Sequence, residues 1–334
     1  MKLAPILYVR PRSEAELLDA LGRYGADAAV LAGGQSLMPE LALRTRAVKV
    51  VVDINHLPGA NRIALRWAAG SAGQMESLAA PADSLGQWPD GMLHIGPLVR
   101  HGDLLRHPLV QRYAPAWAAA AAHIGNVAVR NRGTVCGSLA YADPGGELPL
   151  IAVASAARVC LRSSSGVREV AAGSFFAGAF CTVRRHDEFV AGIHVPAAGP
   201  NSFHFFDEIA RRPTAPALAS IALSVNPIIG QAPSVRIAVG GVSDRPRLLL
   251  ATGEDVSQAL RGMAERQSGA EGVGIALDVD AIHAALRAEL TPLVERDDAV
   301  YRLHLAATLL TRAVAALRAF LDLPPAMPYP GPLT

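Results

Sequence analysis

Apolar and polar positions follow a strand and helix pattern over the first part of the chain. Residues 13–25 carry leucines at helical spacing, and Ser13 and Glu16 form a capping box at their start. Short apolar runs at 28–31 and 48–54 predict two strands, and a glycine turn follows the first run. We therefore expect a small α/β unit with a tight turn at the end of its first strand.

The middle of the chain has weaker strand signals and a stronger helical one. Strands are predicted at 62–65 and 93–95. The segment between them, 66–91, is rich in Ala, Gly, Ser and Pro, which is typical of a surface insertion. Residues 98–123 then follow a helical pattern that two prolines divide, so we expect short helices there rather than one long helix.

The pattern changes near residue 175, where a series of strand candidates begins. These short apolar runs predict an antiparallel sheet, and they lie at 189–195, 203–209, 218–225 and 235–239. Helices follow from Glu254 onward. The last helix, about 299–320, has an apolar face made of Leu303, Ala306, Leu310, Ala313 and Leu317. The predicted fold class is α+β, with a late helical layer.

The composition is that of a chain able to bury a sizeable core. Its 334 residues are 51% hydrophobic, and 31 basic and 29 acidic residues give a net charge of +2 without a basic stripe. This balance argues against nucleic acid as a partner. It favours small ligands or other proteins.

Two apolar segments bear on localisation. The run Leu3 to Val9 is interrupted by Pro5 and is too short for a signal-peptide core, so we expect a cytoplasmic protein. The longest uncharged run, Pro213 to Val235, has nearly the length of a membrane span but contains four prolines. We interpret it as buried strand and loop, and we expect no membrane span.

The spacing of cysteines and histidines offers no metal site. Cys136, Cys160 and Cys181 form no CxxC pair and have no zinc spacing, and the ten histidines form no helical ligand pair. An odd number of separated cysteines agrees with a reducing compartment. We expect neither a metal ion nor an iron–sulfur cluster in this chain.

The turn after the first strand contains the residues of a phosphate-binding loop. Gly33 and Gly34 allow a sharp turn and a close approach of backbone N–H groups to a ligand, and Gln35 and Ser36 add uncharged donors. The same turn can equally be a plain connection between strand and helix, because it contains neither a GxGxxG fingerprint nor a P-loop lysine.

A second glycine loop lies at residues 130–138. It repeats the device of the first loop, and Asp143 and Glu147 follow it as carboxylates able to bind sugar or ribityl hydroxyls. Two such loops suit one long dinucleotide such as FAD, which has both a pyrophosphate and several hydroxyls. Taken alone, Asp143-Pro144-Gly145 can also be a simple turn.

Several phrases of the sequence resemble the FAD-binding medium subunits of the carbon monoxide dehydrogenase and xanthine dehydrogenase group, the molybdenum hydroxylases. The phrases are Ala32 to Pro39, Val52 to Asn55, His94 to His101, Arg130 to Glu147, Arg236 to Pro246 and the helix Tyr301 to Arg312. They cover nearly the whole chain, so the resemblance concerns the complete fold and not one motif.

The resemblance implies an α+β fold with two parts. The first is an FAD-binding domain of the vanillyl-alcohol oxidase or PCMH type in two subdomains, 1–57 and 58–174, and the second is an α+β C-terminal domain, 175–334. FAD would lie between these pieces. The implied FAD-binding residues are Leu31, Ala32, Gly33, Gly34, Gln35, Ser36 and Leu37, then Gly133, Thr134, Val135, Cys136, Gly137 and Ser138, with Asp143 and Glu147 as polar contacts and Val190 near the isoalloxazine.

The sequence departs from the family pattern at three places. Cys136 stands where the family usually has glycine, so its side chain must point away from the phosphate or crowd it. Asp207 stands where many relatives carry a lysine near the flavin, and residues 213–216 replace an acidic-aromatic pair. For Cys136 we favour a small buried thiol over a redox role, because no partner cysteine lies nearby in sequence.

The resemblance also implies a function. The chain would bind FAD and pass electrons from [2Fe-2S] clusters on a small partner subunit to an acceptor such as NAD, a quinone or oxygen. A large partner subunit would hold the molybdopterin cofactor and oxidise the organic substrate, and the assembly would be a dimer of heterotrimers. No catalytic acid, base or nucleophile is expected in this chain, since the redox chemistry belongs to the cofactor.

Two other functions remain open on the sequence. The chain could be a free-standing flavin oxidoreductase of the same fold, similar to UDP-N-acetylenolpyruvoylglucosamine reductase, which would need its own proton donor at a substrate pocket. It could also be an assembly module that has lost flavin, for which Cys136 and Asp207 are the main arguments.

Overall fold

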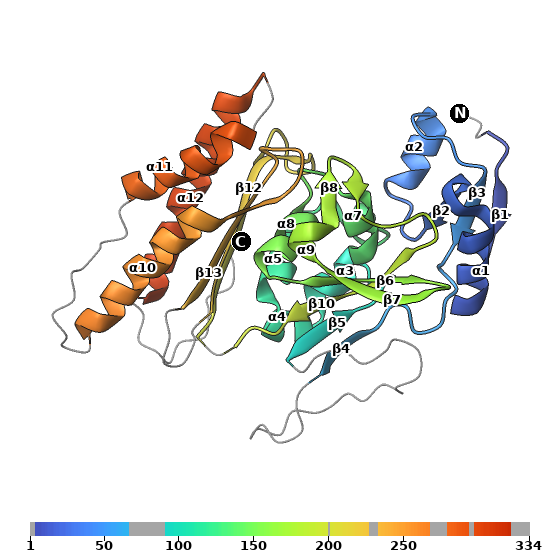
Figure 1. Ribbon diagram of the computed structural model, residues 1–334, viewed down its shortest axis with the longest axis horizontal. Coiled ribbons are helices and arrows are strands. Elements are labelled where there is room, and N and C mark those ends of the chain that lie inside the picture. Colours follow the sequence, from blue (N-terminus) through green and yellow to red (C-terminus); the bar gives the residue numbers. More distant parts are fainter. Residues whose placement is uncertain are drawn as a thin grey trace.

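The computed structural model describes residues 4–66, 91–199, 201–226, 233–267, 279–293 and 297–321. Three blocks lie side by side along the long axis of the molecule (Figure 1). An N-terminal unit is at one end, a five-stranded sheet with its helices is in the middle, and a four-stranded sheet covered by long helices is at the other end. Most of the predicted insertion, residues 67–90, lies outside the described residues.

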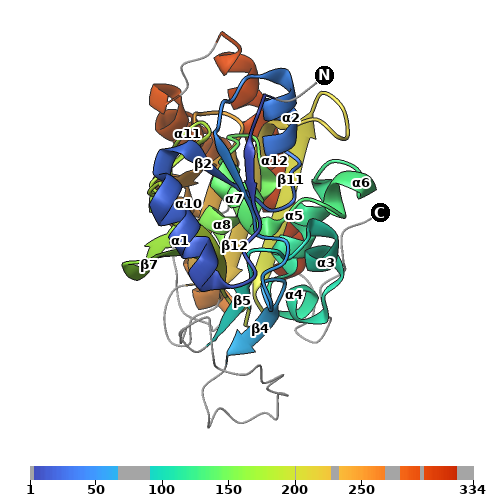
Figure 2. The same ribbon diagram turned by 90° about the vertical axis from the view of Figure 1, so that its right-hand side faces the viewer.

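The N-terminal unit is a three-stranded parallel sheet with two helices (Figure 2). Its strand order is β1 (Leu7–Val9), β3 (Val50–Asp53) and β2 (Ala28–Leu31). Its helices are α1 (Glu14–Tyr24), a short 3-10 turn (Gly25–Asp27) and α2 (Leu37–Leu43). One bond of the predicted capping box is confirmed, because the Ser13 side chain accepts from the backbone N–H of Glu16, whereas the Glu16 carboxylate accepts from the N–H of Arg12 and not of Ser13.

The central sheet is antiparallel, with the order β4-β5-β10-β6-β7. Its strands are β4 (Ile63–Arg66), β5 (Met92–Ile95), β10 (Phe189–Pro196), β6 (Arg158–Ser163) and β7 (Gly166–Ala171).

The sequence pattern predicted that residues 189–195 belong to the C-terminal sheet, and this prediction was wrong. Strand β10 pairs with β5 on one side and β6 on the other. A boundary after β10 therefore fits the sheets better than the predicted one at 174/175.

A layer of short helices packs on the central sheet, as the divided helical pattern predicted. The layer consists of α3 (His101–Arg106), α4 (Pro108–Tyr113), α5 (Pro115–His123), α6 (Val127–Arg130), α7 (Val135–Tyr141), α8 (Glu147–Ala154) and α9 (Ala172–Phe175). Pro108 and Pro115 each begin a helix, where the missing N–H costs no hydrogen bond. A small hairpin, β8 (Phe176–Gly178) and β9 (Cys181–Thr182), leads back to β10.

The C-terminal block is a four-stranded antiparallel sheet with helices on its outer face (Figure 1). Its strands are β11 (Phe203–Ala210), β12 (Ala217–Asn226), β13 (Ser234–Gly240) and β14 (Arg247–Leu249). Its helices are α10 (Leu250–Gln267), α11 (Val279–Leu290), a 3-10 turn (Thr291–Leu293) and α12 (Ala299–Leu321). The helical layer thus begins at Leu250, four residues before the predicted start.

Helix α8 joins the central and C-terminal blocks. It is apolar all round, and the residues after Glu147 are all buried. One side packs against the central helices and the other against β12 and β13. Arg236 of β13 donates to the carbonyl oxygens of Val153 at 2.9 Å and Ala154 at 3.0 Å, which satisfies the carbonyl end of the helix. The C-terminal sheet therefore completes the core of the central block.

Helix α12 is, within the described residues, long and apolar enough to cross a membrane by length and composition. Its apolar residues pack instead against β11, β12 and α11, and Ala306, Leu310, Ala313 and Leu317 of the predicted face are buried there. Arg302 fixes its position by donating to the carbonyl oxygens of Leu218 and Gly241, both at 2.7 Å. The apolar character of α12 is accounted for by this core.

Candidate functional site

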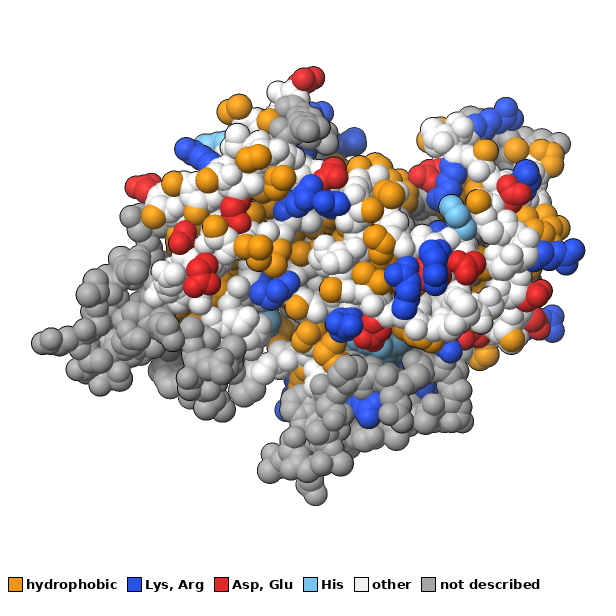
Figure 3. Space-filling view, viewed as in Figure 1, with side chains coloured by type: hydrophobic (Ala, Val, Ile, Leu, Met, Phe, Trp, Pro, Cys, Tyr) orange, Lys and Arg blue, Asp and Glu red, His pale blue; other side chains and the backbone are white. Residues whose placement is uncertain are grey.

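A cavity of about 330 Å³ lies where the N-terminal unit meets the central block. Both glycine loops line it, together with Asp143, Glu147 and Val190. In Figure 3 the surface is hollowed between these two blocks, and basic and histidine side chains gather at the notch. The volume is in the range of small-molecule sites.

The first loop offers backbone donors to the cavity. Strand β2 ends at Leu31, and the turn that follows places Gly34 at a φ of +72°, a conformation that favours glycine. Within the described part of the chain no protein acceptor takes the backbone N–H groups of Gly34, Gln35 and Ser36. Successive free N–H groups in a turn can bind an anion without a charged side chain.

The two loops touch each other by their backbones. A Cβ atom at Gly33 would lie 2.4 Å from the carbonyl oxygen of Arg132 and 2.8 Å from the Cα of Gly133. Gly133 has no more space, because its own Cβ would lie 2.6 Å from the Cε1 of His101. Glycine is required at both positions by this close approach, so neither loop can be a plain turn with a free choice of residue.

A polar bridge holds the loops in register. The Nδ2 of Asn55 donates to the carbonyl oxygen of Ala32 at 2.8 Å, and its Oδ1 accepts from Nη2 of Arg100 at 2.6 Å. The Nη1 of Arg100 donates to the carbonyl oxygen of Arg132 in the second loop. Two side chains thus connect the carbonyl groups of both loops.

The second loop leads directly into α7. Thr134 caps this helix, since its Oγ1 accepts from the N–H of Gly137 at 3.1 Å. A Cβ at Gly137 would lie 2.6 Å from that oxygen, which explains the glycine. The Ser138 hydroxyl pairs with Nε2 of the buried His101 at 3.0 Å. The buried His101 therefore orients the Ser138 hydroxyl in the cavity wall.

The Cys136 thiol points into the core. Its Sγ lies 3.8 Å from the carbonyl oxygen of Gly96 and 4.0 Å from that of Ile95, at the end of β5. Burial raises the pKa of the thiol, so it stays protonated. The side chain turns away from the loop, which is the first of the two alternatives that the sequence left open.

Asp143 and Glu147, the two carboxylates that follow the second loop, are both shielded from water, and burial raises the pKa of each. Asp143 Oδ1 accepts from the N–H of Gly145 at 2.9 Å, so the predicted turn exists as well as the cavity wall. Burial raises the pKa of Glu147 to about 7, and the nearby Glu208 carboxylate of β11 acts in the same direction. Glu208 in turn lies 3.6 Å from Nδ1 of His123. Glu147 can therefore both donate and accept hydrogen bonds near neutral pH.

Two of the predicted residues lie behind the loops. Val135 is fully buried and its N–H donates to the carbonyl oxygen of Val99, and Leu31 packs beneath Gly34. Other residues line the cavity although sequence reasoning did not select them, namely Arg46, His101, Ile124, Tyr141, Arg184, His186 and Phe189. Arg46, Arg184, His186 and Phe189 belong to no motif that could have identified them, whereas His101 and Tyr141 lie within the family phrases His94 to His101 and Arg130 to Glu147.

Comparison with known proteins assigns the chain. The model of an FAD binding domain in molybdopterin dehydrogenase matches residues 2–76 and 87–198. The nicotine 6-hydroxylase medium subunit of Paenarthrobacter nicotinovorans is 33% identical over 72% of this chain and 76% of its own length. The chain belongs to this family of FAD-binding subunits. The carbon monoxide dehydrogenase medium chain of Hydrogenophaga pseudoflava is 30% identical over 71% of this chain and 74% of that one.

Solved structures agree with the family over the whole FAD-binding subunit. The carbon monoxide dehydrogenase of Hydrogenophaga pseudoflava that lacks the Mo-pyranopterin moiety aligns with a TM-score of 0.78 at 27% identity and covers 96% of this chain and 99% of that one. Quinoline 2-oxidoreductase of Pseudomonas putida 86 aligns with a TM-score of 0.75 at 28% identity, with the same coverage. The predicted family, the α+β FAD-binding fold and FAD as the cofactor are confirmed.

The residues of this FAD-binding subunit fit the cofactor of its family. Free N–H groups and the hydroxyls of Ser36 and Ser138 suit phosphate and ribityl oxygens, and the cavity has an apolar wall at Ile124 and Val190.

Asp207, which departs from the family pattern, forms an ion pair within this chain, because its Oδ2 accepts from Nη1 of Arg312 of α12 at 2.8 Å. Residues 213–216 form the turn between β11 and β12. Asp207 and residues 213–216 both lie outside the two glycine loops.

Proposed function

We propose that this chain is the FAD-carrying electron-transfer subunit of a heteromeric molybdopterin-dependent dehydrogenase. The observation that carries the proposal is the convergence of two glycine loops on one cavity, with their backbones in contact. The names of relatives support the multi-subunit assembly, because three of them are called the medium subunit or medium chain of a hydroxylase or dehydrogenase. The described residues contain no group of three or more His, Cys, Asp or Glu able to hold a metal.

In this proposal the chain binds, orients and electrically tunes its cofactor. FAD, when bound, supplies one-electron and two-electron redox chemistry. The N–H groups of Gly34, Gln35 and Ser36 would hold phosphate oxygens, and Asp143 and Glu147 would accept from ribityl hydroxyls. A protonated Glu147 also offers a proton at the cavity wall near neutral pH. No residue of this chain acts on an organic substrate.

The proposal also names the partner subunits and the electron acceptor. A small subunit with [2Fe-2S] clusters would deliver electrons, and a large molybdopterin subunit would oxidise the substrate, in a dimer of heterotrimers located in the cytoplasm. The acceptor would be NAD, a quinone or oxygen. Mass determination of the purified complex tests the assembly, and reoxidation of the reduced complex by each acceptor in turn identifies the physiological class.

The central experiment compares the isolated chain with the complex. The purified chain is expected to show a flavin absorbance spectrum and to release FAD, and not FMN, on denaturation. Substrate is expected to bleach this spectrum only when both partner subunits are present. If the isolated chain oxidised an organic substrate at a substantial rate, the chain would be a free-standing flavin oxidoreductase instead.

A further inference from the structure

Two guanidinium groups line the cofactor cavity from segments far apart in sequence. Arg46 lies between α2 and β3, and Arg184 lies in the loop between β9 and β10. The pKa of Arg184 is lowered by burial and then by the positive charge of Arg46, so the two cations are close enough to repel each other. His186 lines the same cavity from the same loop.

The backbone of its own loop holds Arg184 in place. Its Nη1 donates to the carbonyl oxygens of Glu188 at 2.6 Å and Arg185 at 2.9 Å, and its backbone N–H donates to Oγ1 of Thr182 at 3.3 Å. These bonds use neutral oxygens, so no carboxylate of the described residues hydrogen-bonds the guanidinium, although Glu188 and Asp187 attract its charge from nearby. The rest of its planar donor set remains for a ligand.

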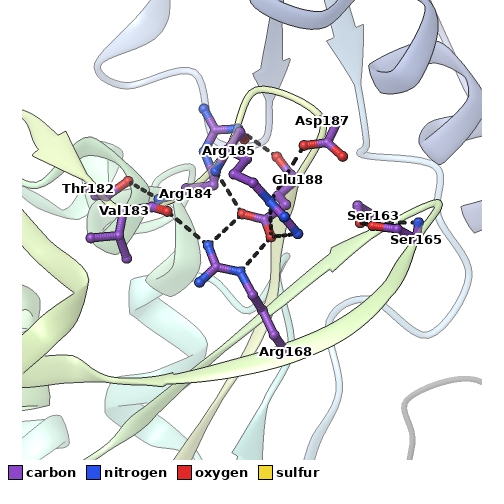
Figure 4. A network of polar contacts seen from close by, with 9 residues as sticks. All are labelled: Ser163, Ser165, Arg168, Thr182, Val183, Arg184, Arg185, Asp187 and Glu188. Carbon is purple, nitrogen blue, oxygen red and sulfur yellow. Dashed lines mark hydrogen bonds and ion pairs between the residues drawn. The ribbon is translucent and has the colours of Figure 1, made fainter.

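The buried carboxylate of that loop, Glu188, already forms hydrogen bonds with two other arginines (Figure 4). The buried Glu188 accepts from Nε of Arg168 at 2.7 Å and from Nη2 of the same residue at 2.9 Å. It also accepts from the backbone N–H of Arg185 at 2.7 Å and from its Nε at 3.1 Å. Glu188 fixes the loop through these bonds, and it attracts the charge of Arg184 less strongly than burial and Arg46 oppose that charge, so the pKa of Arg184 stays lowered.

The charge of Arg46 is only weakly compensated. Its Nη1 lies 3.4 Å from Oε2 of Glu40, and its side chain is 45% exposed. An exposed ion pair of this length contributes little free energy and leaves the guanidinium free to turn toward a stronger anion. The cavity therefore contains two arginines whose mutual repulsion an anion would relieve.

We propose that Arg184 and Arg46 form a phosphate-binding subsite of this cavity and grip the pyrophosphate that the glycine loops contact through neutral N–H groups. The identification of that pyrophosphate with the one in FAD rests on the proposed function. Arginine binds phosphate through two parallel charge-assisted hydrogen bonds, which are stronger than bonds from neutral donors. The subsite would thus make the chain select FAD over a flavin without phosphate.

The test measures ligand affinities of the full-length apo chain by isothermal titration calorimetry. Wild type, Arg184→Gln, Arg46→Gln and the double variant are titrated with FAD, riboflavin, ADP and inorganic pyrophosphate. Arg212→Gln is the matched control, because Arg212 is exposed in the turn after β11 and the same charge is lost there. Circular dichroism verifies that each variant is folded.

We expect Arg184→Gln to weaken FAD binding about ten- to hundred-fold, as the loss of one or two charge-assisted hydrogen bonds predicts, and the double variant to weaken it further. Riboflavin affinity is expected to stay within about twofold, and Arg212→Gln to match wild type. FAD affinity should also fall more steeply with added salt in wild type than in the double variant.

Unchanged FAD affinity in Arg184→Gln, or an equal loss of FAD and riboflavin, would overturn the subsite and leave the proposed function intact. If wild type bound neither flavin, the proposed function would fail by itself. In that case arginine-dependent binding of ADP or pyrophosphate would still support the subsite, and no binding of either would overturn it.

Discussion

Gly33 and Gly133 meet backbone to backbone, with so little space that a Cβ on residue 33 would lie 2.8 Å from the Cα of residue 133. The two residues belong to the two loops that line the cavity, and Asn55 and Arg100 connect these loops. The cavity geometry therefore depends on a contact between two residues that have no side chain. This dependence can be tested by substitutions in the loops and behind them.

The first prediction concerns Gly33→Ala. The new methyl group must push the loops apart, because the atoms it meets are backbone, so we expect a loss of stability of roughly 1–3 kcal/mol and at least a tenfold weaker FAD affinity. Thermal unfolding with and without FAD measures both effects. Gly22→Ala is the control, since Gly22 lies in α1 with nothing within 4 Å of its added Cβ and should be neutral or slightly stabilising. Equal behaviour of the two variants would contradict the prediction.

The second prediction concerns the polar bridge. Asn55→Ala removes the bond to Ala32 and leaves a partly buried guanidinium group of Arg100 without one acceptor, so unfolding should become easier by roughly 1–3 kcal/mol. FAD should stabilise the variant less than it stabilises wild type. Urea unfolding measures the change. Asn61→Ala, at an exposed asparagine of a turn, is the control, and a loss no larger than in this control would show that the bridge is not needed.

The third prediction uses the raised pKa of Glu147. The folded chain holds this proton up to about pH 7, whereas an unfolded glutamate loses it near its ordinary pKa of 4.5. Between these values the folded state binds more protons, so the contribution of Glu147 to stability falls as pH rises, by about 1.4 kcal/mol per pKa unit. Glu147→Gln stays neutral and escapes this loss.

Urea unfolding of wild type and Glu147→Gln across this pH window measures the difference. The variant should gain stability relative to wild type as pH rises from about 4.5 to about 7. Glu254→Gln changes the net charge equally at an exposed site of α10 and should show no such trend. Parallel pH curves for wild type and Glu147→Gln would mean that Glu147 titrates as an ordinary surface group.

The fourth prediction concerns Cys136→Gly. Its thiol contacts the core and not the loop, so FAD affinity should stay within about twofold. Stability should fall by about 1–2 kcal/mol, because a buried side chain is lost and glycine is unfavourable in a helix. Cys181→Ser, at an exposed cysteine, is expected to change neither quantity. A large change in FAD affinity would place the thiol in contact with the cofactor.

Local signals in the sequence located most elements of this fold. The capping box at Ser13 and the prolines at 108 and 115 mark helix starts, and the turn after Leu31 marks the first loop. These features depend on neighbouring residues only, so they can be read without knowing the rest of the chain. The family phrases added the fold and the cofactor, which local patterns alone left open.

Sheet membership could not be predicted in the same way. Strand β10 is buried along nearly its whole length, so it has no alternation of apolar and polar residues that would show which sheet contains it. Its partners β5 and β6 are set by contacts between distant segments. The hairpin of β6 and β7 was not predicted at all.

Arg46 and Arg184 could not be predicted as neighbours either, because 138 positions separate them in the sequence and only the fold brings them to one cavity.

Because α8 is buried on all sides, the FAD-binding region and the C-terminal block share one core. The recognised FAD-binding region ends at residue 198, yet Arg236 and strands β12 and β13 cover the far side of this helix and satisfy its last carbonyl groups. A fragment cut after residue 198 would present that apolar side and those carbonyl groups to water. Residue 198 therefore marks the end of the matched domain and not of an independently folding unit, because the C-terminal block shields the apolar side of α8 from water.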